Sequence, residues 1–182
     1  MGATKRMESA KGAVLSMLAD SYRHRDRVGL VAFRGNSADL LLPLCSSVDL
    51  AQKRLEDLPT GGKTPLAAGL AKGMEVLQQE QRKNGEVIPM MVVLSDGRAN
   101  VPISGDVRPE VLGIAGKIRA QGIRTVVIDT EETGNSFITF RLGYCRAIAE
   151  HTGGGYYPIA DLSAGLLHDI TAAERDVMVH PA

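Results

Sequence analysis

The sequence predicts an α/β fold, a doubly wound and mostly parallel sheet with one antiparallel edge strand. Three short runs rich in Val, Ile, Leu and Met, with no polar alternation, are typical of strands that a parallel sheet buries on both faces. These runs lie at 27–33, 87–94 and 124–130. Between them, apolar residues recur every three or four positions, as they do in amphipathic helices. This alternation of strand and helix indicates right-handed crossover units.

Turn-forming residues, prolines and glycines set the expected element boundaries. Residues 34–37 join the strand at 27–33 to a short strand at 39–44, so we expect a hairpin whose second strand is antiparallel and lies at an edge, where Pro43 is tolerated. Pro65 opens a helix at a position where its missing N–H costs nothing. The expected elements are helices at 4–22, 49–58, 65–83, 109–121, 141–152 and 163–176, and strands at 27–33, 39–44, 87–94, 124–130 and 156–160.

The bulk composition limits the number of domains and the class of partner. A chain of 182 residues has the length of one ordinary domain, so we expect a single domain over 1–182 with a frayed tail at 176–182. Twenty-one Lys and Arg balance twenty-one Asp and Glu, so no net field attracts nucleic acid or an anionic membrane. Proteins, small molecules and ions remain as partners.

The cysteines and the hydropathy pattern indicate a cytoplasmic protein. Cys45 and Cys145 lie far apart in the sequence, and neither has the spacing to other residues that a zinc site needs. We therefore predict that both are buried thiols of a protein in a reducing compartment. No apolar run approaches the ~18 residues that a membrane span needs.

Several catalytic motifs fail on spacing. Gly62-Lys63-Thr64 suggests a phosphate-binding loop, but that loop requires a glycine five residues earlier, where Asp57 stands inside a predicted helix. Neither a Gly-x-Ser-x-Gly elbow nor a dinucleotide-binding glycine pattern after a strand is present. The four histidines are scattered along the sequence, so we predict that they are surface or packing residues. They are His24, His151, His168 and His180. We therefore predict no catalytic residue and no residue that binds an organic cofactor.

Thr64 and Asp96 form the remaining candidate site. Asp96 ends the strand at 87–94, and Thr64 precedes the helix that leads into this strand. In open α/β sheets ligands bind at the carboxyl ends of the strands, and a hydroxyl with a carboxylate suits a hard cation such as Mg²⁺. The structural alternative makes Thr64 a helix N-cap and Asp96 a turn residue.

Four segments together resemble a known family. They are Arg6–Val14, Arg27–Gly35, Thr60–Leu66 and Leu94–Asn100, and their order is similar to that in the von Willebrand A (integrin I) domain at the C-terminus of the magnesium chelatase D subunit. The resemblance covers nearly the whole chain and implies a three-layer fold. It also implies a metal-ion-dependent adhesion site, in which Thr64 and Asp96 match the second and third of three metal-binding segments.

The resemblance also implies that one segment is missing. In the family, an Asp-x-Ser-x-Ser loop and the strand before it immediately precede residues like Met1 to Met7. We therefore expect this chain to begin after that first strand, which would lie between the strands at 27–33 and 87–94, and we expect Mg²⁺ binding to be weak.

The function implied is a metal-dependent protein-interaction domain in tetrapyrrole biosynthesis. The implied partners are an AAA-type ATPase subunit and a porphyrin-binding subunit, which together insert Mg²⁺ into protoporphyrin IX. The domain itself would not be catalytic. One alternative is a stand-alone von Willebrand A protein with a different AAA-type ATPase. The other is a small α/β enzyme that uses Asp96, with Asp129 at the end of the next strand as its second titratable group.

Overall fold

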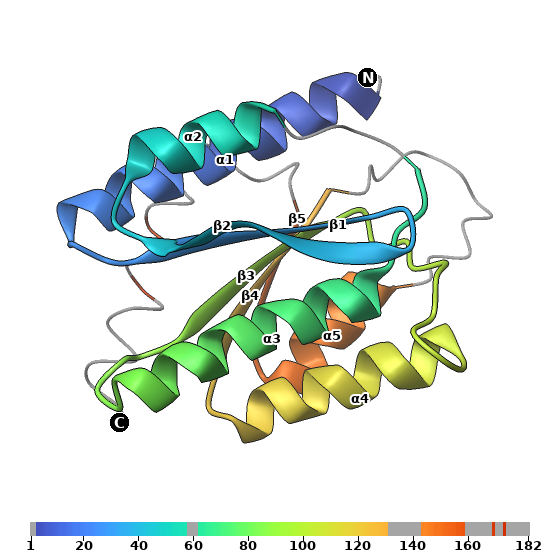
Figure 1. The fold of residues 1–182 in the computed structure, drawn as a ribbon. Coiled ribbons are helices and arrows are strands. Elements are labelled where there is room, and N and C mark those ends of the chain that lie inside the picture. Colours follow the sequence, from blue (N-terminus) through green and yellow to red (C-terminus); the bar gives the residue numbers. More distant parts are fainter. Residues whose placement is uncertain (1–2, 58–61, 131–142, 159–168, 170–172, 174–182) are drawn as a thin grey trace. The chain divides into compact units, whose positions relative to one another are not determined.

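The computed structural model describes residues 3–57, 62–130, 143–158, 169 and 173 (Figure 1). Its α/β class agrees with the expectation from the sequence. The described elements are, in order, α1 (Ala3–Arg23), β1 (Val28–Arg34), β2 (Ser37–Cys45), α2 (Val48–Glu56), α3 (Leu66–Lys83), β3 (Met90–Ser95), α4 (Val107–Ala120), β4 (Arg124–Asp129), α5 (Tyr144–Thr152) and β5 (Gly155–Pro158).

The chain divides into two compact units. The first contains the described residues of Met1–Ala32, Asp39–Gly61 and Leu162–Ala182, and the second contains those of Phe33–Ala38 and Gly62–Asp161. β1 and β2 form the predicted hairpin, most of which belongs to the first unit, and α1 packs beside α2 in that unit (Figure 1). Leu18 of α1, Leu42 of β2 and Ala51 of α2 meet in the core of this unit.

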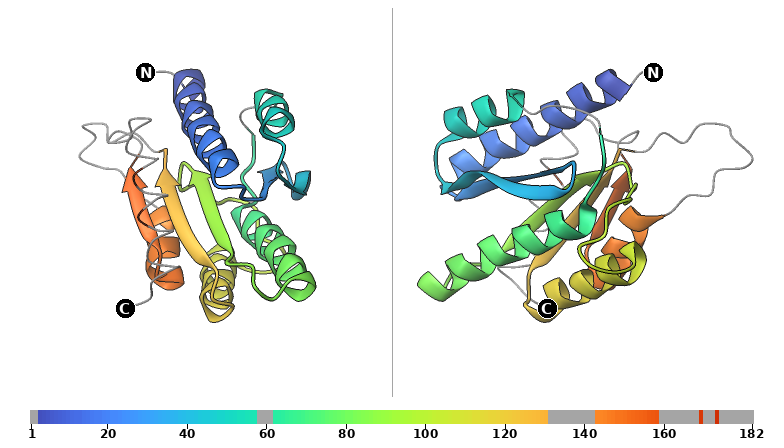
Figure 2. Two further views of the ribbon diagram at one scale, coloured as in Figure 1. Left: turned by 90° about the vertical axis from the view of Figure 1, so that its left-hand side faces the viewer. Right: turned by 45° about the vertical axis from the view of Figure 1, so that its right-hand side comes forward.

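The second unit contains a parallel sheet with strand order β3-β4-β5. Val92 of β3 pairs with Val126 of β4, which in turn pairs with Gly155 of β5. The helices α3, α4 and α5 run along one face of this sheet (Figure 2). A core cluster of this unit includes residues from these helices and from the sheet, with Leu66, Val111, Val127 and Ile148 all at 0% exposure.

The hairpin forms a two-stranded sheet of its own; the family pattern described above places a further strand between those at 27–33 and 87–94. The burial of β3 differs from expectation. It is β4 that is buried on both faces, whereas β3 alternates between buried residues such as Met91 and Val93 and partly buried ones such as Val92. An apolar run reports average burial, but it specifies neither the neighbours of a strand nor how completely each face is covered.

Two predicted segments fall largely outside the described residues. The loop at 131–140 lies entirely outside them, as does the tail at 176–182. Of the terminal helix predicted at 163–176, only Asp169 and Ala173 are described, and both are helical.

A close approach between Phe33 and Gly69 fixes how α3 packs in the second unit. A Cβ atom added at Gly69 would lie 2.5 Å from Phe33 Cδ1 and 3.0 Å from Phe33 Cβ. The phenylalanine ring therefore packs directly on the backbone of α3. This contact lies near the first turn of the helix, close to the loop that contains Thr64.

We expect Gly69→Ala to destabilise the protein by about 1–3 kcal/mol, because the added methyl group displaces the Phe33 ring from a packed core. Gly116→Ala is the matched control, since Gly116 is exposed on α4 and a Cβ there has no neighbour within 4 Å. Its higher helix propensity should stabilise the protein by up to about 1 kcal/mol. Urea unfolding measures both changes, and equal effects would contradict the proposed close packing.

Candidate metal centre

Thr64 lies in the loop before α3 and is partly buried. The N-cap of α3 is Pro65, and no side chain makes a capping hydrogen bond there. Thr64 is therefore not the N-cap that the structural alternative required. Its hydroxyl remains available for another role.

Asp96 directly follows the last residue of β3. One carboxylate oxygen, Oδ1, accepts a hydrogen bond from the Arg98 N–H at 3.1 Å, which is the turn role expected of an Asp at this position. The other, Oδ2, lies 3.7 Å from Arg98 Nε in an ion pair whose side chains are 44% and 70% exposed. Such an exposed pair is weak. Asp96 thus combines a turn function with a side chain that is 44% exposed.

The loops that contain Thr64 and Asp96 are joined through Asn100. The Thr64 N–H donates to Asn100 Oδ1 at 2.8 Å, and the Asn100 N–H donates to the Thr64 carbonyl at 3.3 Å. Sequence reasoning named Asn100 only as the end of the segment Leu94–Asn100 and gave it no role at the site, because nothing in the local pattern links it to a residue 36 positions earlier. Its place four residues after Asp96, in a loop rich in turn formers, was the available signal.

Hydrogen bonds to the side chain and the carbonyl of Ser95 fix the carboxyl end of β3. Ser95 Oγ accepts the Gly97 N–H at 3.1 Å, and the Ser95 carbonyl accepts the Thr130 N–H at 2.9 Å. The thiol of Cys145, which is 1% exposed, also donates to the Ser95 carbonyl at 3.5 Å. Cys145 is a buried free thiol, as predicted, whereas Cys45 is partly buried.

Two cationic residues, Lys63 and Arg34, lie in or beside the Thr64 loop. Lys63 is exposed, and its carbonyl accepts the N–H of Gly35, from the turn between β1 and β2, at 3.1 Å. A Cβ added at Gly62 would lie 3.7 Å from Arg34 Nε, so the Arg34 side chain passes beside this loop. The backbone contacts therefore bring the hairpin turn, the glycine-rich loop and the Asp96 loop together.

The loop after Asn100 is tied to α4 by one carboxylate. Glu110 accepts the backbone N–H groups of Ile103, Ser104 and Gly105 at 2.6, 2.7 and 2.6 Å. These hydrogen bonds, those from Ile103 and Ser104 first, lower the pKa of Glu110. The Glu110 carboxylate therefore holds the loop at residues 103–105 to α4.

The donor chemistry fits a hard divalent cation in an open site. Thr64 offers a hydroxyl oxygen and Asp96 a carboxylate oxygen, which are the ligand types that Mg²⁺ prefers. Within the described residues, no three His, Cys, Asp or Glu side chains are placed to hold a metal ion. The remaining ligands would be water or oxygens from another molecule, since Mg²⁺ usually keeps several waters.

Asp129 ends β4, in register with Ser95, and is 9% exposed. Its Oδ2 accepts a hydrogen bond from the Tyr156 hydroxyl at 2.7 Å, and the Arg146 guanidinium lies 4.8 Å from the centre of the Tyr156 ring. Burial, together with the Asp129 carboxylate, raises the pKa of Tyr156 to about 12. Asp129 is thus engaged with Tyr156, which weakens the case for it as the second acid or base of an enzyme.

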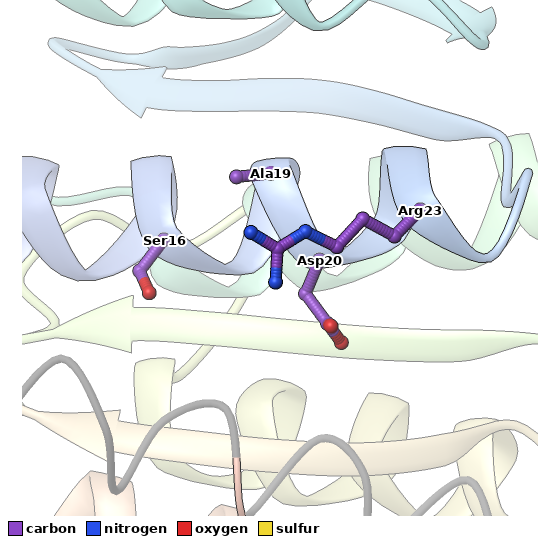
Figure 3. A pocket seen from close by; sticks show the side chains of 4 residues that line it. All are labelled: Ser16, Ala19, Asp20 and Arg23. Carbon is purple, nitrogen blue, oxygen red and sulfur yellow. The ribbon is translucent and has the colours of Figure 1, made fainter.

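A cavity of about 240 Å³ lies against α1, lined by Ser16, Ala19, Asp20 and Arg23 (Figure 3). These residues share one face of the helix, as their spacing requires. Asp20 is 3% exposed, and His24 Nδ1 lies 3.6 Å from its Oδ1. None of the four was predicted as a site residue.

Comparison with known proteins gives a consistent set of similarities. Residues 1–98 match the family described as von Willebrand factor type A domain. The chain is 47% identical over 170 residues to an uncharacterised protein of Methanocaldococcus jannaschii, covering 93% of this chain and 95% of that protein. It is 39% identical over 174 residues to the magnesium-chelatase 67 kDa subunit of Chlorobaculum parvum, covering 89% of this chain but only 27% of that subunit.

Solved structures share the fold at low sequence identity. An aerotolerance-related membrane protein from Bacteroides fragilis has a TM-score of 0.71 at 23% identity, covering 93% of this chain and 88% of that one. Proximal thread matrix protein 1 from the mussel byssus, whose structure has a zinc-occupied MIDAS motif, has a TM-score of 0.63 at 16% identity, covering 92% and 43%. In the part of this chain that the structure describes, no helix is both long enough and apolar enough to cross a membrane.

We expect Tyr156→Phe to destabilise the protein by about 1–3 kcal/mol at neutral pH, because the buried Asp129 carboxylate loses a hydrogen-bond donor. The variant should also change the alkaline pH dependence of unfolding. The pKa of Tyr156 is raised from 10.0 to about 12 in the folded state, so its contribution is complete below pH 10 and is lost as pH rises toward 12.

Urea unfolding across this alkaline range should show the loss of stability in the natural protein and a smaller loss in Tyr156→Phe. Tyr22→Phe is the control, because Tyr22 is 65% exposed. Identical alkaline profiles for the two variants would contradict the Tyr156–Asp129 interaction.

Proposed function

The chain belongs to the von Willebrand factor type A domain family, and from this premise we propose that it is a metal-dependent protein-interaction domain. The observation that carries the proposal is the pair of hydrogen bonds between Thr64 and Asn100, which joins the two loops that contain the oxygen donors. Asp96 follows the carboxyl end of β3, which is where open α/β sheets bind ligands.

Thr64 and Asp96 are the proposed metal ligands. A bound Mg²⁺ supplies a hard positive charge at the surface that favours oxygen donors. Thr64 offers a neutral hydroxyl and Asp96 a negative charge, while the exposed Lys63 and Arg98 place positive charge around them. With two ligands from the protein, coordination leaves positions for an oxygen from a partner.

We propose that the partners are those of a magnesium chelatase D-type subunit. Support comes from the 39% identity to the Chlorobaculum parvum subunit, of which this chain spans 27%. The domain would act in the cytoplasm with an AAA-type ATPase subunit and a porphyrin-binding subunit. Insertion of Mg²⁺ into protoporphyrin IX would belong to the complex, with this domain contributing recognition and no catalytic group.

A second candidate is a stand-alone von Willebrand A protein that works with a different AAA-type ATPase. The observation that favours it is the Methanocaldococcus jannaschii relative, which this chain covers over 95% of its length. Capture experiments with each class of ATPase from the source organism distinguish the two candidates.

We expect Asp96→Ala to fold normally but to lose Mg²⁺-dependent capture of the ATPase subunit, because the removed carboxylate is exposed and contributes little to the core. Pull-down with Mg²⁺, and again with a chelator, measures the effect. In the natural protein the chelator should abolish capture.

Asp106→Ala is the matched control, since Asp106 is an exposed carboxylate at the N-cap of α4 that makes no side-chain capping bond. It should behave as the natural protein does. Undiminished Mg²⁺-dependent capture by Asp96→Ala would exclude the proposed site, and capture that is insensitive to the chelator would exclude the metal dependence.

A further inference from the structure

We propose that Asn100 is a positioning residue that sets the metal affinity of this site by holding the Thr64 and Asp96 loops in one arrangement before a metal binds. The inference rests on the proposed function, because it takes Thr64 and Asp96 as the ligands. It adds a role for a residue that offers no ligand to the metal, since its Oδ1 is already bonded to the Thr64 N–H.

The contact between Asn100 and Thr64 has two points of attachment. The 2.8 Å bond from the Thr64 N–H to Asn100 Oδ1 is short for an N–H···O bond, and the 3.3 Å bond from the Asn100 N–H to the Thr64 carbonyl runs in the opposite direction. Two antiparallel bonds between the same residues fix both their separation and their relative orientation. Removing the Asn100 side chain leaves only the longer bond.

On one side of this contact, the chain from Asp96 to Asn100 is firmly held. The Asp96 side chain binds the Arg98 N–H, Gly97 adopts a left-handed conformation at φ 70°, and Ala99 is 7% exposed within the core. These restraints fix the position of Asp96 relative to Asn100.

On the other side, Thr64 is followed at once by fully buried residues. Pro65 is among the most deeply buried side chains, and Leu66, the first residue of α3, is 0% exposed. Thr64 therefore connects a fixed helix start to the exposed glycine-rich loop at Gly62 and Lys63. The bond to Asn100 holds this junction in place relative to Asp96.

An open site depends on such positioning more than a closed one does. With two protein ligands, the metal contributes too little binding energy to order two independent loops. Outer-shell groups that orient metal ligands typically change metal affinity by about 10–100-fold when they are mutated. We expect Asn100→Ala to weaken Mg²⁺ and Mn²⁺ binding by about tenfold, although both ligands remain.

The test compares three variants with the natural protein by Mn²⁺ titration, monitored by electron paramagnetic resonance, and by Mg²⁺ calorimetry. Asn100→Ala should bind about tenfold more weakly. Asn100→Asp keeps an acceptor for the Thr64 N–H and should retain at least natural affinity. Asn84→Ala is the matched control, because Asn84 Oδ1 also accepts a backbone N–H in an exposed turn, that of Glu86 at 3.1 Å, and it should bind as the natural protein does.

Two measurements on the metal-free proteins separate positioning from a general loss of structure. The Thr64 amide should exchange its hydrogen faster in Asn100→Ala, whereas the thermal midpoint should stay close to that of Asn84→Ala. The positioning role would be overturned if Asn100→Ala had both a lower thermal midpoint than Asn84→Ala and weaker metal binding, and if Asn100→Asp restored neither.

The outcomes also distinguish this inference from the proposed function. If the natural protein binds neither Mg²⁺ nor Mn²⁺, the metal site is wrong and the role of Asn100 is wrong with it. If the natural protein binds and Asp96→Ala does not, while Asn100→Ala keeps the natural affinity, the site stands and the positioning role is excluded.

Discussion

The parallel pairing of β3 with β4 is the constraint on which the rest of the site depends. Its ladder runs from Met90 opposite Arg124 to Ser95 opposite Asp129, and a further hydrogen bond joins the Thr130 N–H to the Ser95 carbonyl. Because parallel strands end on the same side of a sheet, this register brings the ends of both strands to one rim. A shift of this register by one residue would turn Ser95 out of the core and would break the hydrogen bonds of Ser95 that hold the chain just before Asp96.

Local patterns in the sequence were sufficient to predict most elements, and they are also the source of the two proposed ligands. The apolar runs and the helical spacing identified the strands and helices, since burial imposes their periods directly. The relation between Thr64 and Asp96 followed from topology, because a loop before a crossover helix and the end of the next strand share one rim. The first residues of elements were less predictable: Pro109, expected to start α4, is its third residue.

What the sequence could not provide is long-range pairing. The contact of Asn100 with Thr64 spans 36 positions and depends on side-chain geometry that no spacing rule describes. The engagement of Asp129 by Tyr156 likewise required the neighbouring strand in place, since the two residues lie 27 positions apart.

The loop from Ile103 to Gly105 is attached to α4 through the carboxylate of Glu110, so its attachment depends on the protonation state of that group. Three backbone N–H groups converge on Glu110, whose pKa lies below the usual value of 4.5, so protonation in acid replaces a strong acceptor with a weaker one. The neighbouring apolar core, with Val111 at 0% exposure, has no such dependence. Acidification below the usual carboxyl range would therefore loosen this surface loop while the helix that carries Glu110 stays folded, a local opening.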